Sequence, residues 1–243
     1  MSAEKTPTPD FGDTTGSRPG RRTPLIIATV AIVAAIGVTA AVGLGDGDSD
    51  KAPANGAVAV VSGGDDPTKV ATVLDRPYAK PNLVLTDAQG QKFDLRERTK
   101  GKPTLLYFGY THCPDVCPMT MSNIAIAKKQ LPKADQDKLE VVFVTTDPER
   151  DTPAELAKWL PAAGDPSFTG LTGEFATIQA GARQIGIGID PPKKEGDQVI
   201  SMHGAQVVAF SPTTDQGYVL YGEDAGVDDY AKDLPKLIKG ENP

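Results

Sequence analysis

The chain has 243 residues, which is enough for one substantial domain and additional segments. Its formal net charge of −7 at pH 7 argues against nucleic acid as a partner, because nucleic acid is bound mainly through basic surface. Two cysteines are too few to hold a fold together with disulfides, so buried apolar side chains must supply the core.

An uncharged apolar stretch near the N-terminus predicts a membrane anchor. Residues 25–44 consist only of Leu, Ile, Val, Ala, Gly and Thr, and about 20 such residues in a helix cross a hydrocarbon core of roughly 30 Å. Three arginines between positions 18 and 22 precede the stretch, and three aspartates between positions 46 and 50 follow it. The positive-inside rule therefore keeps residues 1–22 in the cytoplasm and carries the rest of the chain across the membrane.

This arrangement predicts how the chain is organised. We expect a disordered cytoplasmic tail at residues 1–22, a single transmembrane helix at residues 23–45, a flexible linker at residues 46–75 and a folded domain at residues 76–243. An uncleaved anchor is favoured over a cleaved signal peptide, because the apolar stretch exceeds the roughly 7–15 residues usual in a signal peptide. The expected location is the cell membrane, with the folded domain on the extracytoplasmic side.

The first half of the folded domain is expected to alternate strands and helices. Two short apolar runs, at residues 83–85 and 93–95, flank a turn sequence and predict a hairpin. Longer apolar runs at residues 103–109 and 141–146 are typical of strands buried on both faces. Each of these strands is followed by an expected helix. Pro118 suits the first position of one helix, and Thr152 is expected to cap the other.

The second half supplies a further helix at residues 174–185 and antiparallel strands at residues 206–210 and 218–221. A final helix is expected at residues 227–238, where Pro235 should weaken the second half. Strand–helix alternation followed by a hairpin and a helix is the order of a thioredoxin-like α/β domain, in which a central mixed sheet is flanked by helices.

Both cysteines lie in one motif, Cys113-Pro114-Asp115-Val116-Cys117, at an expected strand–helix junction. The carboxyl ends of strands collect ligands in open α/β sheets, and a helix N-terminus favours thiolate over thiol. Four residues apart on a helix, the two sulfurs can converge on one metal ion or close a disulfide. A purely structural disulfide is disfavoured, because closing so short a loop contributes little chain entropy.

His203 is the expected third metal ligand. Soft thiolates select Cu(I), and an added imidazole suits Cu(II) as well. His203 precedes the strand expected at residues 206–210, and a thioredoxin-like sheet places that loop next to the Cys motif. His112 is the rival ligand, but a residue directly before Cys113 would generally point elsewhere.

Three methionines, Met119, Met121 and Met202, lie near the proposed ligands in the sequence. Thioethers are soft donors that could assist copper transfer. Flexible packing beneath an active-site loop is the favoured interpretation.

Two sequence blocks around these residues closely resemble the Sco/SenC family of copper chaperones. The first block is FGYTHCPDVCP, at residues 108–118, and the second is TDPERDTP, at residues 146–153. His203 follows at about the separation expected for the family. The resemblance covers roughly residues 80–240.

The resemblance implies a thioredoxin-like domain tethered to the membrane by one helix, with copper held by Cys113, Cys117 and His203. It further implies delivery of copper, or of reducing equivalents, to the dinuclear CuA centre of cytochrome c oxidase. The copper-accepting oxidase subunit would then be the partner, with other copper chaperones and thiol reductants as further candidates. The family's aspartate in the second block corresponds to Asp147, which could orient a ligand or partner, or only form the turn before Pro148.

Two functions stay open at this point. The chain is either a copper chaperone or a thiol–disulfide oxidoreductase that keeps the copper-ligand cysteines of the oxidase subunit reduced, and the two activities are compatible. His203 discriminates between them, because a pure dithiol enzyme does not need it. Outside the cytoplasm, Cys113 and Cys117 are expected to form a readily reducible disulfide when metal is absent. Oxidation should then abolish copper binding while leaving the fold largely intact.

Overall fold

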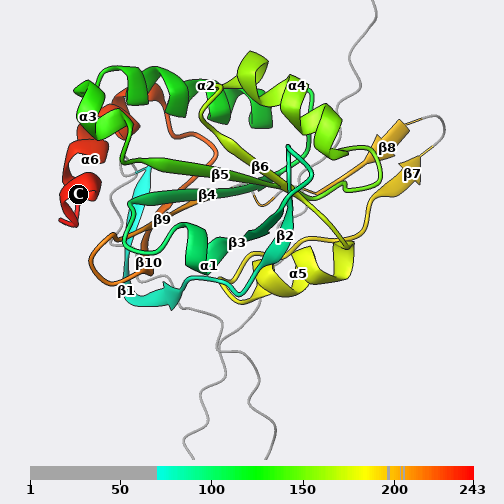
Figure 1. Ribbon diagram of the computed structural model, residues 1–243, viewed down its shortest axis with the longest axis horizontal. Helices are drawn as coiled ribbons and strands as arrows, with labels where there is room; N and C mark the ends of the chain where they lie inside the picture. The colour runs from blue at the N-terminus through cyan, green and yellow to red at the C-terminus, as the bar shows by residue number, and fades with distance from the viewer. Residues whose placement is uncertain (1–69, 196–197, 203, 205) are drawn as a thin grey trace, which may run out of the picture. The chain divides into compact units, whose positions relative to one another are not determined.

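The computed structural model describes residues 70–195, 198–202, 204 and 206–243, and Figure 1 shows a sheet with helices on both faces. The sheet has eight strands in the order β1-β10-β9-β4-β5-β6-β2-β3, with a separate β7–β8 hairpin. The strands are β1 (Ala71–Ala79), β2 (Val84–Asp87), β3 (Lys92–Asp94), β4 (Thr104–Gly109), β5 (Glu140–Thr145), β6 (Thr169–Thr172), β7 (Lys193–Glu195), β8 (Gln198–Ile200), β9 (Val207–Phe210) and β10 (Gln216–Tyr221). The helices are α1 (Leu95–Arg98), α2 (Val116–Lys129), α3 (Lys133–Gln136), α4 (Pro153–Ala163), α5 (Phe175–Arg183) and α6 (Val227–Lys239).

Strand β4 lies inside the sheet and sets the position of its neighbours. It pairs in parallel with β5, where Tyr107 is opposite Phe143, and antiparallel with β9, where Tyr107 is opposite Val207. All six residues of β4 are buried, as the continuous apolar run predicts. Because β9 runs against β4, the chain that leads into β9 lies at the carboxyl end of β4.

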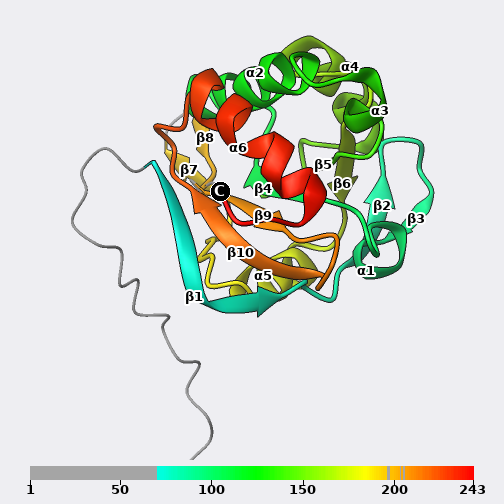
Figure 2. The same cartoon turned by 90° about the vertical axis from the view of Figure 1, so that its left-hand side faces the viewer.

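The two faces of the sheet carry separate cores, and Figure 2 shows α2 and α4 on the opposite side of the sheet from α5. Successive strand residues point to opposite faces, so Leu105 and Tyr107 join one core while Leu106 and Phe108 join the other. Helices α2, α4 and α6 cover the first face, and α1 and α5 cover the second. This mixed α/β sheet between two layers of helices is the architecture predicted from the sequence.

The expected helices and strands are found, with three corrections. Helix α2 begins at Val116, so Pro118 is its third residue rather than its first. Proline is tolerated at the third position as well, because the first N–H groups of a helix have no intrahelical partner that proline would remove. Pro235 lies inside α6, which nevertheless continues to Lys239. The domain boundary expected at Arg76 falls within β1, which pairs with β10.

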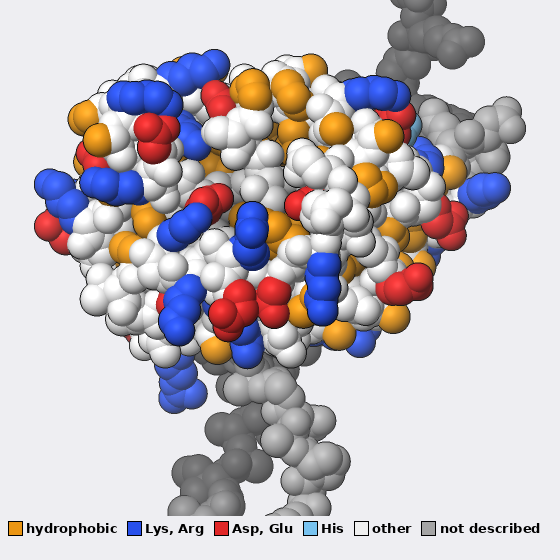
Figure 3. All heavy atoms as spheres, viewed as in Figure 1, with side chains coloured by type: hydrophobic (Ala, Val, Ile, Leu, Met, Phe, Trp, Pro, Cys, Tyr) orange, Lys and Arg blue, Asp and Glu red, His pale blue; other side chains and the backbone are white. Residues whose placement is uncertain are grey.

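The predicted cytoplasmic tail and transmembrane helix, and the linker up to residue 69, lie outside the described residues. Within the part of the chain that the structure describes, no helix has both the length and the apolar character needed to cross a membrane. On the face viewed in Figure 3, basic and acidic side chains are interspersed rather than gathered by sign. One such pair on the surface joins Lys102 to Glu140, with 2.7 Å between the ammonium and a carboxylate oxygen.

Candidate metal and thiol site

The two cysteines lie where β4 gives way to α2. Cys113 is in the connecting turn and Cys117 is in the first turn of the helix. The Cys117 backbone N–H donates a hydrogen bond to the Cys113 sulfur, with an N···S distance of 3.3 Å. Both cysteines are free thiols and both are buried. The helix start therefore brings the two sulfur-bearing residues together, as their spacing predicts.

The Cys117 sulfur occupies a space bounded by β4. The hydroxyl of Tyr107 donates a hydrogen bond to it, at 3.3 Å. A Cβ atom at Gly109 would lie 2.9 Å from this sulfur, and equally close to the rings of Tyr107 and Phe143. Such a distance is shorter than van der Waals contact allows, so the missing side chain at Gly109 is what makes room for the sulfur.

Burial outweighs the helix N-terminus in setting the protonation state of Cys117. Loss of water raises the pKa of the Cys117 thiol to about 12, although the hydrogen bond from Tyr107 acts in the opposite direction. The sequence expectation that the helix start favours thiolate is therefore wrong for Cys117 in the metal-free protein. A metal ion that binds this sulfur must displace its proton.

A buried carboxylate fixes the turn that carries Cys113. Asp151 has no solvent exposure, and it accepts hydrogen bonds from the backbone N–H of Thr111 at 2.9 Å and from the Thr111 hydroxyl at 2.6 Å. A third hydrogen bond comes from the hydroxyl of Thr145, at the end of β5, at 2.6 Å. Asp151 thus ties the loop after β4 to the end of the neighbouring strand.

His112 faces this carboxylate. Its Nδ1 lies 3.0 Å from the Thr111 hydroxyl oxygen and 3.5 Å from Asp151 Oδ1. Because Thr111 gives its own proton to Asp151, the contact with His112 requires Nδ1–H as the donor. The ring is half exposed. These partners support the expectation that His112 points away from the sulfur site.

Asp147 contacts the segment that precedes position 203. Its buried carboxylate is paired with the Arg150 guanidinium and accepts a hydrogen bond from the Ser201 hydroxyl at 3.0 Å. Arg150 also donates to the backbone carbonyl of Val199 at 3.3 Å. Asp147 thus forms the turn after β5, where its backbone carbonyl accepts from the N–H groups of Arg150 and Asp151, and it also holds a distant segment. Its orientation of a ligand or partner stays a prediction.

His203 itself lies outside the described residues, but the residues on each side of it are anchored. Ser201 is held by Asp147, and the backbone N–H of Gly204 donates to the Phe108 carbonyl at 2.8 Å. A Cβ at Gly204 would lie 3.1 Å from the Phe108 Cβ. Gly204 is thus attached to the end of β4, directly before the Cys turn, and Ser201 to the turn after β5.

The three methionines divide between two environments. Met121 is fully buried in the core beneath α2, in agreement with the packing interpretation. Met119 and Met202 are each 50% exposed, so core packing does not explain these two thioethers.

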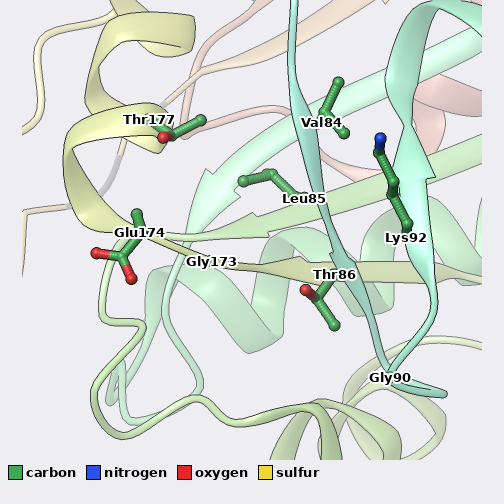
Figure 4. A pocket seen from close by; sticks show the side chains of 8 residues that line it. All are labelled: Val84, Leu85, Thr86, Gly90, Lys92, Gly173, Glu174 and Thr177. Carbon is green, nitrogen blue, oxygen red and sulfur yellow. The ribbon is translucent and has the colours of Figure 1, made fainter.

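Among the described residues, no group of three His, Cys, Asp or Glu side chains could hold a metal ion. The third ligand expected from the sequence, His203, is not among them. A hollow of about 530 Å³ lies elsewhere, between the β2–β3 hairpin and the start of α5 (Figure 4). Its lining contains no expected site residue and consists of Val84, Leu85, Thr86, Gly90, Lys92, Gly173, Glu174 and Thr177.

Sequence reasoning did not identify Tyr107, Gly109 or Asp151 as site residues. The alternation of β4 offered one signal, because Tyr107 and Gly109 are two residues apart and must share a face. Asp151 lies beside Asp147 in the second block that resembles the family, but only the folded chain shows that it pairs with Thr111.

Comparison with known proteins gives a consistent result. The model of the SCO1/SenC family matches residues 73–239. A putative copper-binding protein of Stutzerimonas stutzeri is 33% identical over 172 residues, which are 70% of this chain and 81% of that protein. The copper-bound structure of Bradyrhizobium japonicum ScoI has 31% identity and a TM-score of 0.56, covering 67% of this chain and 98% of that one.

A further solved structure is that of BsSco, a member of the Sco family of cytochrome c oxidase assembly proteins in which a disulfide switch has been identified. It has 27% identity and a TM-score of 0.53, and the match covers 67% of this chain and 95% of BsSco. The fold and the sequence blocks thus point to the same group of proteins.

Proposed function

This chain belongs to the SCO1/SenC family, and on that premise we propose that it binds copper through Cys113, Cys117 and His203 and delivers it to the copper-accepting subunit of cytochrome c oxidase. Copper is here a cargo that the protein receives and passes on. The observation that carries the proposal is the pairing of the two free thiols at the start of α2, with the flanks of position 203 attached to the same end of the sheet.

The donor set suits copper. Two thiolates are soft ligands that select Cu(I), and one imidazole extends the site to Cu(II). The space left by Gly109 accommodates the Cys117 sulfur without a side chain in its way. Burial keeps that thiol protonated until a metal displaces the proton, so copper uptake at neutral pH releases protons to the solvent.

Asp147 and Arg150 have a supporting part in the proposal. Through Ser201 and Val199 they hold the segment before His203, and metal-ligand geometry depends on such outer contacts. We expect Asp147 to position the histidine segment rather than to ligate copper.

The anchor completes the proposal. A transmembrane helix at residues 23–45 would place the domain on the extracytoplasmic side of the cell membrane, where the CuA centre implied by the family resemblance is assembled. Support comes from the apolar stretch at residues 25–44 and its flanking charges.

The test uses the full-length protein, purified in detergent and reduced. One equivalent of Cu(I) or Cu(II) is added to the wild type, to His203→Ala and to the matched control His112→Ala. We expect one copper per chain in the wild type and the control, and a changed Cu(II) absorption spectrum in His203→Ala. A wild type that binds no copper, or a His203→Ala protein with an unchanged spectrum, would contradict the proposal.

A second candidate function rests on the same thiols. Two free cysteines joined by a hydrogen bond at a strand–helix junction are also suited to disulfide exchange, and a disulfide switch is known in the related BsSco. On this hypothesis the protein reduces the copper-ligand cysteines of the oxidase subunit. Incubating the reduced protein with an oxidised acceptor peptide tests it, with Cys113→Ser as the control. No loss of the peptide's disulfide would exclude this function.

A further inference from the structure

We propose that Tyr107 is a positioning residue of the copper–thiolate site, whose hydroxyl stabilises the negative charge on the Cys117 sulfur when copper replaces the thiol proton. This inference rests on the proposed function, because it concerns the same sulfur. It goes further by assigning a role to a residue outside the Cys motif that donates a hydrogen bond to a ligand atom.

The geometry directs the phenol at the sulfur. Tyr107 is 1% exposed and Cys117 is fully buried, so water does not compete for the hydrogen bond at 3.3 Å between them. A phenol has one proton, and Tyr107 gives it to the Cys117 sulfur.

The bare Cα of Gly109 supports this role. The Tyr107 ring, the Cys117 sulfur and the Phe143 ring all lie within 2.9 Å of where a Gly109 Cβ would be. The ring and the sulfur thus share one closely packed space on the face of β4 that α2 covers. The backbones of β4 and α2 hold the ring and the sulfur in contact, so this contact does not depend on the rotation of a flexible side chain.

Two other buried tyrosines in the same core have different surroundings. The hydroxyl of Tyr230 has no hydrogen-bond partner among the described residues, and that of Tyr221 donates to Asp233 at 3.3 Å. Only Tyr107 of these three donates to a sulfur. A thiol is a weak acceptor, whereas hydrogen bonds to an ionised acceptor are roughly twice as strong as neutral ones. The Tyr107 contact therefore gains strength when the sulfur becomes a thiolate.

Copper uptake then proceeds without any change of oxidation state. The Cys117 S–H bond breaks, its proton passes to water, and a sulfur–copper bond forms. Tyr107 keeps its proton throughout and stabilises the charge that remains on the sulfur. Hydrogen bonding around a cysteine sulfur also tunes the electronic properties of a bound copper ion, so the effect should be visible in the spectrum.

The test compares Tyr107→Phe with the wild type and with the matched control Tyr230→Phe, in the full-length reduced protein. Cu(I) affinity is measured by competition with a chromophoric chelator. Loss of an outer hydrogen bond typically weakens metal binding by about 10- to 100-fold, so we expect about 10-fold weaker binding in Tyr107→Phe. Tyr230→Phe should match the wild type.

A spectroscopic readout separates this role from simple packing. In Tyr107→Phe the sulfur-to-Cu(II) charge-transfer band should move to lower energy, because the sulfur electrons lose the stabilising donor. The metal-free stability of Tyr107→Phe and Tyr230→Phe should change by similar small amounts. Copper affinity and band energy equal to the wild type in Tyr107→Phe would overturn this inference alone. A wild type that binds no copper would overturn the proposed function with it.

Discussion

Cys113 and Cys117 lie in the turn and first helical turn that follow β4, whereas the segment of residues 199–202 and 204 begins in β8 and reaches the same end of the sheet. The first segment, residues 110–117, is held by buried packing, by a helix start and by Asp151. The second, residues 199–204, is held among its described residues by hydrogen bonds that Ser201 donates to Asp147, that Gly204 donates to the Phe108 carbonyl, and that Val199 accepts from Arg150.

This difference indicates how a site that takes up and releases a metal can be built. A helix start fixes the spacing of two residues regardless of what they bind. A segment held by a few hydrogen bonds costs less to move, because each such bond contributes only about 0.5–1.5 kcal/mol net. We therefore expect the thiol pair to be rigid and the histidine segment to adjust when copper binds or leaves.

The largest expected effect comes from removing the buried carboxylate under the Cys turn. Asp151→Ala leaves the Thr111 N–H and two hydroxyls without their shared acceptor. We expect the free energy of unfolding to fall by about 3 kcal/mol, because these bonds involve a buried charged group. Chemical denaturation of the reduced, metal-free protein measures it. Asp137→Ala removes an exposed acid paired with Lys133 and should cost less than about 0.5 kcal/mol. Equal losses in the two variants would refute the role of Asp151.

A smaller effect is expected from filling the space beside the Cys117 sulfur. Gly109→Ala places a Cβ 2.9 Å from that sulfur, and overpacking of this kind typically costs about 1–3 kcal/mol. Copper binding should weaken as well, because the sulfur must move. Gly188 is the matched control, since a Cβ there meets nothing within 4 Å. The account fails at this point if Gly109→Ala and Gly188→Ala have the same stability and the same copper affinity.

Loosening the second segment should have a modest effect on stability. Ser201→Ala removes one hydrogen bond to Asp147, at a cost of about 1 kcal/mol. Amide hydrogen exchange should increase at residues 199–204 and stay unchanged at residues 110–117. Ser122→Ala, on α2, serves as the control. Faster exchange in the Cys segment as well would show that the two segments are not held independently.

The sequence predicted the local features of the fold and the site, but not the contacts between residues that lie far apart in the chain. Strand β4, the Thr152 cap of α4 and the Cys spacing were predictable because each depends on neighbouring residues. The contacts of Asp151 with Thr111, and of Asp147 with Ser201, join residues 40 and 54 positions apart. No local pattern encodes such pairs.

Two expectations failed for identifiable physical reasons. The first residues of β1 were assigned to a linker because they follow an Asp-, Gly- and Ala-rich stretch; the strand contains Pro77, and five of its nine residues are exposed. These features suit an edge strand, where proline is tolerated and one side is free. The thiolate expected at Cys117 was wrong because the helix-start argument considers charge but not the loss of water around the sulfur.

The smallest effect lies in α6, away from both segments. Burial raises the pKa of Asp233, against the hydrogen bond from Tyr221 that lowers it. A folded-state pKa above the unfolded value means that ionisation of Asp233 destabilises the fold. The penalty is absent below the unfolded pKa and develops as the pH rises through the folded pKa. Asp233→Asn should therefore be more stable than the wild type at pH 7, with the advantage disappearing near pH 3.5, in denaturation curves at both pH values. An advantage that is independent of pH would contradict this explanation.

The most direct test of the central claim is X-ray absorption of the copper-loaded, full-length protein. The account predicts two sulfur ligands and one imidazole nitrogen around copper in the wild type. His203→Ala should keep both sulfurs and lose the imidazole, while His112→Ala should keep all three ligands. A wild-type copper site without two sulfurs, or an imidazole that persists in His203→Ala and vanishes in His112→Ala, would contradict the account.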